Sequence, residues 1–182
     1  MNAKRLTQLG LLSTIALIIF AVELRLPNLS PVPGVKPGLA NIVTVYAVYR
    51  CTAKETALIL LTRIILGSVF GGNMLALLYS LGGGTLCLLG MLLLRKIIDE
   101  KHIWICSIIG AVLHNIGQII VAITVMKTMA VISYLPFLMV SGCIAGAFTG
   151  MCAQILIAKI QMRRDKNCLL YTSPSPRDRS LS

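Results

Sequence analysis

The sequence contains few charged side chains and very few acidic ones. Charged residues make up 13% of its 182 positions, and only six are Asp or Glu, whereas soluble domains are about 25% charged. Apolar residues reach 57%, and the mean hydropathy is +0.86. These apolar residues occur in long runs of the kind that cross a bilayer. The composition therefore argues against an ordinary soluble domain and predicts an all-α, polytopic membrane protein.

The sequence also lacks the residue sets that enzymes use. It has no Ser-His-Asp set, no paired buried carboxylates and no phosphate-binding loop. The five acidic residues before position 168 are too few for an Asp-rich magnesium–diphosphate site. A metal site is not expected either, because only His102, which we place in a loop, could join His114. The six cysteines form no Cys-x-x-Cys pair and are interpreted as small buried side chains. We expect no catalytic residue, no metal and no cofactor.

The net charge of +11 would suit a nucleic-acid-binding protein, but its distribution does not. The basic residues stand between the apolar runs rather than on one soluble face, as the positive-inside rule predicts for membrane proteins. We therefore expect a bilayer around the chain and no nucleic acid partner.

Six apolar runs predict six transmembrane helices in one domain, residues 1–167. The second run is short, since a perpendicular span needs about 20 residues. Four prolines and two glycines between Leu26 and Gly38 exclude a helix there, and predict a loop that dips into the membrane surface or covers a cavity. The six predicted helices are Leu9–Val22, Leu39–Tyr49, Thr56–Phe70, Met74–Leu94, Ile103–Met126 and Ile132–Ala158.

The basic residues also predict the orientation. With the N-terminus inside, eleven Lys and Arg residues fall in inside segments and three in outside segments, namely Arg25, Lys36 and Lys127. This bias predicts that both termini face the cytoplasm, with the chain crossing the membrane several times. It also requires the short second helix to cross, since otherwise the later loops would change sides.

The last fifteen residues are predicted to be foreign to the protein. Cys168 to Asp178 reads CLLYTSPSPRD, and codons for these eleven residues can spell a common transposon-type sequencing adapter in one frame. The alternative is a native tail rich in Ser and Pro. We expect residues 168–182 to be adapter read-through, and such segments are excluded from reasoning about the fold.

Arg63 is the most informative single residue, because it falls near the middle of the third apolar run. A charge at the centre of a bilayer costs at least about 2.5–3.5 kcal/mol. One interpretation is that Arg63 faces a cavity and binds an anionic ligand. The alternative is a structural pair with Glu23 at the end of the first helix, or a side chain that extends to the membrane interface.

The fifth helix carries three polar residues in the segment HNIGQ: His114, Asn115 and Gln118. His114 and Gln118 are four positions apart and so share one face of a helix. They predict the lining of a cavity. The alternative is hydrogen bonding between helices, which contributes about 0.6 kcal/mol per bond in membranes.

The start of the second helix offers a further candidate contact. Lys36 and Asn41 flank this start, where unpaired N–H groups and a partial positive charge favour an anion. The alternative is a solvated lysine beside an ordinary helix start. Asn73 and Tyr79, in the outer part of the fourth helix, are weaker candidates, and for Tyr79 the alternative is ordinary packing.

Glycines are spaced for close helix packing. Gly142, Gly146 and Gly150 repeat every four residues, as do Gly67 and Gly71. Small residues at this spacing lie on one face and let helix backbones approach. Three consecutive glycines, residues 82–84, predict a kink or another close contact.

Several segments together resemble a small bacterial family called Gx transporter, which is also labelled heptaprenyl diphosphate synthase component I. The segments are GVKPGLANIVTVYAVY, LLTRIILGSVFGG, LLYSLGGGTLCLL and AVLHNIGQIIVA, and the resemblance covers roughly residues 5–160. Pro37 stands where the family pattern has Leu. The family is similar in size and plan to the substrate-binding S components of energy-coupling-factor importers.

The resemblance implies a transporter component that binds a small polar or anionic micronutrient while a separate membrane subunit and ATPases drive uptake. The candidate substrate-binding residues are then Lys36, Asn41, Arg63, Asn73, Tyr79, His114, Asn115 and Gln118. The second family label implies a different role, a non-catalytic membrane component of a long-chain prenyl diphosphate synthase. A membrane scaffold subunit is a third possibility.

Overall fold

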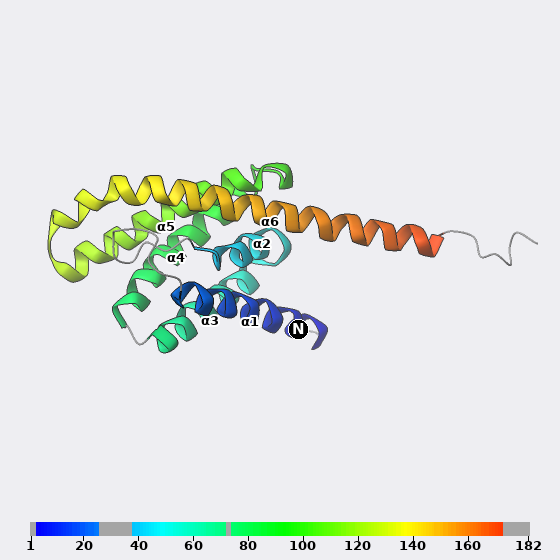
Figure 1. Ribbon diagram of the computed structural model, residues 1–182, viewed down its shortest axis with the longest axis horizontal. Coiled ribbons are helices and arrows are strands. Elements are labelled where there is room, and N and C mark those ends of the chain that lie inside the picture. The colour runs from blue at the N-terminus through cyan, green and yellow to red at the C-terminus, as the bar shows by residue number, and fades with distance from the viewer. Residues whose placement is uncertain (1–2, 26–37, 72–73, 173–182) are drawn as a thin grey trace, which may run out of the picture.

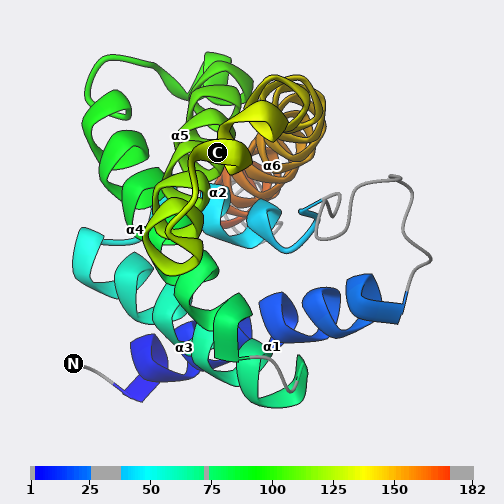
Figure 2. The same ribbon diagram turned by 90° about the vertical axis from the view of Figure 1, so that its left-hand side faces the viewer.

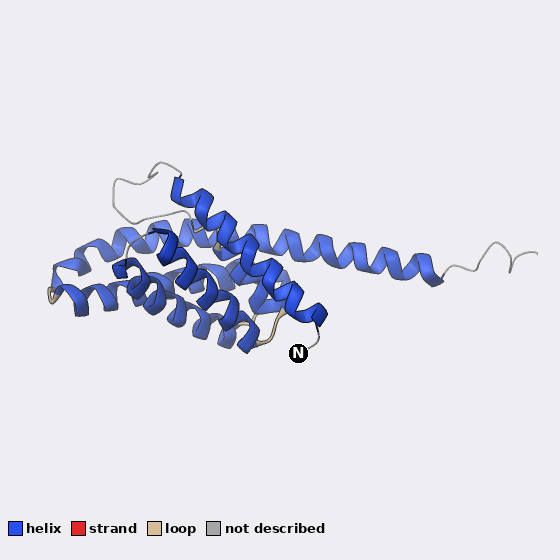
Figure 3. Ribbon diagram, turned by 90° about the horizontal axis from the view of Figure 1, so that it is seen from below, coloured by secondary structure: helices blue, strands red, loops and turns tan. Residues whose placement is uncertain are grey.

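A computed structural model of the chain describes residues 3–25, 38–71 and 74–172. These residues form helices and no strand (Figure 3), which confirms the all-α prediction. The described elements are α1 (Ala3–Arg25), α2 (Asn41–Arg50), α3 (Ala53–Gly71), α4 (Met74–Leu94), the short 3-10 helix η1 (Glu100–His102), α5 (Ile103–Met126), the 3-10 helix η2 (Met129–Tyr134) and α6 (Leu135–Thr172).

Most of the predicted helix positions agree with these bounds. The predicted fourth and fifth helices coincide with α4 and α5, while α1 and α3 begin earlier than expected. The sixth prediction ran from Ile132 to Ala158, but residues 129–134 form η2 and α6 continues to Thr172. Figure 1 shows α6 projecting past the rest of the bundle. The predicted loop falls largely on residues 26–37, which lie outside the described part, as do residues 173–182 of the predicted tail.

Within the described part of the chain, four helical segments are long and apolar enough to cross a membrane: Ala3–Glu23, Met74–Leu94, Glu100–Met126 and Met129–Arg163. Their outward side chains are apolar as well, for example Met74 at 79% exposed and Ile144 at 69%. So much exposed apolar surface needs an apolar environment. The chain is therefore a multi-pass membrane protein. α2 and α3 do not belong to this group, because α2 has ten residues and α3 contains Lys54, Glu55 and Arg63.

The helices alternate in direction, so that one set of ends gathers on one side of the bundle. Arg5 near the start of α1 pairs with Glu55 near the start of α3 at 2.8 Å. At the same end, Arg50 closes α2 and pairs with Glu100 of η1 at 3.3 Å. Arg95, just after α4, donates to the carbonyl of Val48 in α2 at 2.7 Å. This end collects many of the basic residues that we predict to face the cytoplasm.

Glycines set the packing of α4, α5 and α6, which lie side by side in Figures 1 and 2. A Cβ on Gly117 of α5 would stand 2.6 Å from the carbonyl oxygen of Gly82 in α4. A Cβ on Gly146 of α6 would stand 2.9 Å from the Cα of Ile108 in α5. The glycine run in α4 is thus a close-packing site, and the spacing in α6 serves the α5 contact. Gly71, in contrast, has no packing neighbour within 4 Å of such a Cβ among the residues that the structure describes.

The predicted orientation can be tested by labelling single cysteines with a membrane-impermeant maleimide. We expect Asp99→Cys, at the basic end, to be protected in intact cells and labelled only after permeabilisation. Lys127→Cys, after α5 at the opposite end, is the matched control and should be labelled in intact cells. Labelling of position 99 from outside would reverse the assigned orientation.

Candidate polar site in the middle of the bundle

α2 begins in the interior of the bundle rather than at its edge. Its ten residues span about 15 Å at 1.5 Å per residue, which is about half of a hydrocarbon core of about 30 Å. Its first residue, Asn41, accepts a hydrogen bond from Arg63, and Arg63 is the eleventh of the nineteen residues of α3 (63 − 53 + 1). The N-terminus of α2 therefore lies level with the middle of α3. The remaining part of the predicted second crossing falls on residues outside the described part.

Arg63 is a cation with few protein partners. Its Nη1 donates to Asn41 Oδ1 at 3.0 Å, and this is its one hydrogen bond among the described residues. The ion pairs within the described part involve Arg5 and Arg50, both at the basic end. A guanidinium carries five N–H donors in a fixed fork, so most of the donor capacity of Arg63 is not used by these partners.

Glu23 is the one buried carboxylate among the described side chains, with 4% of its surface exposed. It accepts a hydrogen bond from the backbone N–H of Gly38, just ahead of α2. The carbonyl of Gly38 accepts from the Asn41 N–H at 2.9 Å, so the partners of Glu23 and Arg63 belong to one turn of chain, although Glu23 and Arg63 do not form one of the described ion pairs. Glu23 therefore tethers the end of α1 to the start of α2 beside the Arg63 guanidinium.

Two of the three polar residues of the HNIGQ segment in α5, His114 and Gln118, lie against α4. A Cβ on Gly83 would stand 2.9 Å from Cε1 of His114 and 2.9 Å from Cγ of Gln118. A Cβ on the next residue, Gly84, would stand 3.0 Å from Cδ1 of Ile64, which follows Arg63 in α3. The absence of a side chain at Gly83 thus makes room for this polar face next to the α3 cation.

Asn115 has a different environment. Its amide donates to the carbonyl of Leu138 in α6, and it packs against Gly142 of the same helix. A hydrogen bond between helices was the alternative to a cavity lining for this residue. Asn115 therefore takes part in the α5–α6 contact in this structure.

The remaining predicted site residues are less informative. Tyr79 lies half-buried in α4, one turn before Gly83. Lys36 and Asn73 lie outside the described residues. Glu23 was expected only as a structural partner of Arg63. Its signal in the sequence was weak, because a single acidic residue at the end of an apolar run also suits a solvated helix end.

Gly38 holds the start of α2 in place. Its φ of +68° lies in the left-handed region, which costs other residues about 1–2 kcal/mol, and a Cβ there would stand 3.2 Å from Nδ2 of Asn41.

We expect Gly38→Ala to destabilise the protein by about 1–2 kcal/mol and to disturb Asn41. Chemical denaturation in detergent measures this effect. The neighbouring Leu39→Ala variant is the control for a substitution at the next position. An unchanged denaturation midpoint for Gly38→Ala would contradict the role assigned to Gly38.

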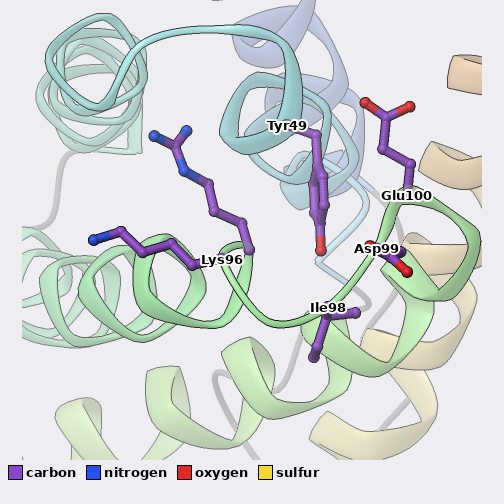
Figure 4. Close-up of a pocket in the computed structure, with 6 residues that line it drawn as sticks. Tyr49, Lys96, Ile98, Asp99 and Glu100 are labelled. Atoms are coloured by element: carbon purple, nitrogen blue, oxygen red, sulfur yellow. The ribbon is translucent and has the colours of Figure 1, made fainter.

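A cavity of about 330 Å³ lies at the basic end, lined by Tyr49, Arg95, Lys96, Ile98, Asp99 and Glu100. In Figure 4, Lys96 points to one side, Asp99 and Glu100 lie on the other, and Tyr49 stands between them. The Tyr49 hydroxyl is buried without a hydrogen-bond partner among the described residues. Ile97, in the same loop, is 80% exposed. This end therefore offers mixed charge and an exposed apolar side chain, not a site of one sign.

Comparison with known proteins identifies the family. No match was found among curated proteins or among solved structures. A family model described as heptaprenyl diphosphate synthase component I matches residues 12–156. This range contains α2 to α5 in full and the polar side chains described above, which we call the central polar cluster: Glu23, Asn41, Arg63, His114 and Gln118. Component I is the non-catalytic component, in agreement with the prediction that this chain is not itself an enzyme. The chain belongs to the heptaprenyl diphosphate synthase component I family, the same family as the Gx type that its sequence resembles.

Proposed function

We propose that this chain is the solute-binding membrane component of an importer in the bacterial cytoplasmic membrane. Its cargo is a small polar or anionic micronutrient, and separate membrane and ATPase subunits energise uptake. The observation that carries the proposal is Arg63, a cation in the middle of α3 with one neutral hydrogen-bond partner among the described residues.

The energetic argument concerns the cost of that cation. A charge at the centre of a bilayer costs at least about 2.5–3.5 kcal/mol on insertion scales. The Asn41 carbonyl offsets only part of this cost, because it is neutral and engages one of five donors. Guanidinium groups bind carboxylates and phosphates through two parallel hydrogen bonds. An anionic group of the ligand would therefore complete the coordination of Arg63.

The surrounding side chains support a small polar ligand. Asn41 and the start of α2 lie beside the guanidinium, and His114 and Gln118 approach from α5 through the space at Gly83. A helix start in the membrane interior favours negative charge, as in broken helices of transporters. The full proposed set remains Lys36, Asn41, Arg63, Asn73, Tyr79, His114, Asn115 and Gln118. Similarity in plan to S components motivates the proposal of separate energising subunits.

A second candidate follows from the family description. The chain would then be a membrane component that holds a soluble catalytic component of a heptaprenyl diphosphate synthase at the bilayer. The exposed Ile97 in the mixed-charge loop at the basic end favours this candidate, because an apolar side chain among charges suits a soluble partner. Ile97→Asp should release such a partner and leave solute binding at Arg63 unchanged.

Identification of the native partners separates the two candidates. The protein should be tagged, cross-linked in its own or a close host, purified gently and analysed by mass spectrometry of the captured chains. Capture of ATPase subunits with an integral membrane subunit supports the importer. Capture of a soluble prenyl synthase without ATPases contradicts it and supports the second candidate.

A further inference from the structure

Two opposite charges share the central polar cluster but come from different helices. Glu23 belongs to α1 and Arg63 to α3. They do not form one of the described ion pairs. Each is held by a different group at the start of α2: Glu23 by the Gly38 N–H, and Arg63 by the Asn41 side chain. The start of α2 thus keeps the two charges near each other but separate.

The described residues do not use the full hydrogen-bonding capacity of either charged group. A carboxylate has about four acceptor positions and a guanidinium has five donors. Within the described residues, Glu23 accepts one hydrogen bond and Arg63 donates one. A pair that served only to neutralise itself would use this capacity in a direct bidentate contact. The separation leaves an acceptor and a donor fork available on two sides of the same region.

The balance of charge restricts the ligand further. Glu23 and Arg63 together carry no net charge. A ligand with only a carboxylate would pair with Arg63 but would leave an uncompensated negative charge beside Glu23, in a region where burying one charge costs at least about 2.5–3.5 kcal/mol. A ligand with a carboxylate and an ammonium group would satisfy both residues and preserve the balance. Two negative groups placed close together repel each other, so Glu23 disfavours a ligand that carries only a carboxylate.

We infer that the importer proposed above takes a small zwitterion of the α-amino acid type, with its carboxylate on Arg63 and its ammonium group on Glu23. This inference rests on the proposed function and names its substrate class. Glu23 is then the residue that distinguishes zwitterions from simple carboxylates. His114 and Gln118, on the α5 side of the cluster, are placed to contact the remainder of the ligand.

The test uses matched pairs of compounds, each an α-amino acid and the carboxylic acid that lacks only its amino group, for example 2-aminobutyrate and butyrate. Binding to the purified full-length chain is followed by thermal shift and by calorimetry. We expect zwitterions of the panel to bind the wild-type protein at least about tenfold more tightly than their partners, a difference typical of one charge-assisted contact. Glu23→Gln should remove this preference. Glu55→Gln, which changes the Glu paired with Arg5 at the basic end, should retain it.

Four outcomes overturn the inference. It fails if no zwitterion of the panel binds, if simple carboxylates bind the wild type as tightly as their amino acids, or if Glu23→Gln leaves the preference unchanged in a folded protein. Since Glu23→Gln could weaken the α2 tether, Glu23→Asp is tested beside it and should retain the sign of the preference. Carboxylate binding that depends on Arg63 but not on Glu23 would overturn this inference and leave the proposed function standing.

Discussion

Replacing Arg63 with Gln should weaken solute binding by about 30-fold or more, because losing one partner of a buried charge pair costs about 2–5 kcal/mol. The helix itself should not suffer, since Gln is a good helix former and removal of a charge from mid-membrane lowers the insertion cost. Arg63→Lys should retain part of the affinity, because lysine keeps the charge but loses the planar fork. Calorimetry with the co-purified solute measures all three proteins.

The matched control is Arg50→Gln. Arg50 also belongs to an ion pair, but it lies with Glu100 at the basic end, away from the central cluster. Its replacement should leave solute binding unchanged. Under either role Arg63→Gln leaves the buried Glu23 carboxylate without a counter-charge and lowers stability, so binding is measured per folded molecule. A large loss of stability with undiminished binding per folded molecule would therefore contradict the assigned role.

Gly117→Ala should destabilise the bundle by about 1–3 kcal/mol, the usual cost of adding a methyl group where there is no room. The added Cβ would stand 2.6 Å from the Gly82 carbonyl oxygen and 2.8 Å from the Cα of Gly83. Both neighbours are backbone atoms, which cannot rotate away as a flexible side chain can. α4 and α5 would have to separate at the level of His114, so solute binding should decline as well.

Gly10→Ala provides the comparison, because it adds the same methyl group where, beyond the adjacent backbone of its own helix, no described atom lies within 4 Å. Alanine favours a helix over glycine by up to about 1 kcal/mol. Gly10→Ala should therefore leave the midpoint of denaturation in detergent unchanged or raise it. Equal effects of the two substitutions would show that close approach of α4 and α5 does not limit stability.

The helical architecture was predictable from the sequence because apolar runs bounded by charges and glycines mark helix ends directly. α4 and α5 matched for this reason, and the spacing of Gly142, Gly146 and Gly150 predicted a close contact that the structure assigns to α5. The length of α6 was less predictable. The polar residues after Ala158 suit either a loop or an exposed helix, and composition alone does not separate the two.

The central cluster was only partly predictable. Arg63 and His114 stood out because polar residues inside apolar runs need a reason. The structure places His114 against Gly83, and the residue after Arg63, Ile64, against Gly84. The position of α2 could not be predicted, since its ten residues suited a short span equally well. The partner of Asn115 also required the structure, because which face of α5 meets α6 depends on packing between segments distant in sequence.

Native mass spectrometry of the chain truncated at Lys166, purified gently in wild-type and Arg63→Gln forms, tests the central claim most directly. The account predicts a small polar molecule bound to the wild-type chain and absent from a folded Arg63→Gln chain. A wild-type chain that carries no small molecule but retains a soluble prenyl synthase would contradict it, and would make the polar cluster part of an assembly scaffold.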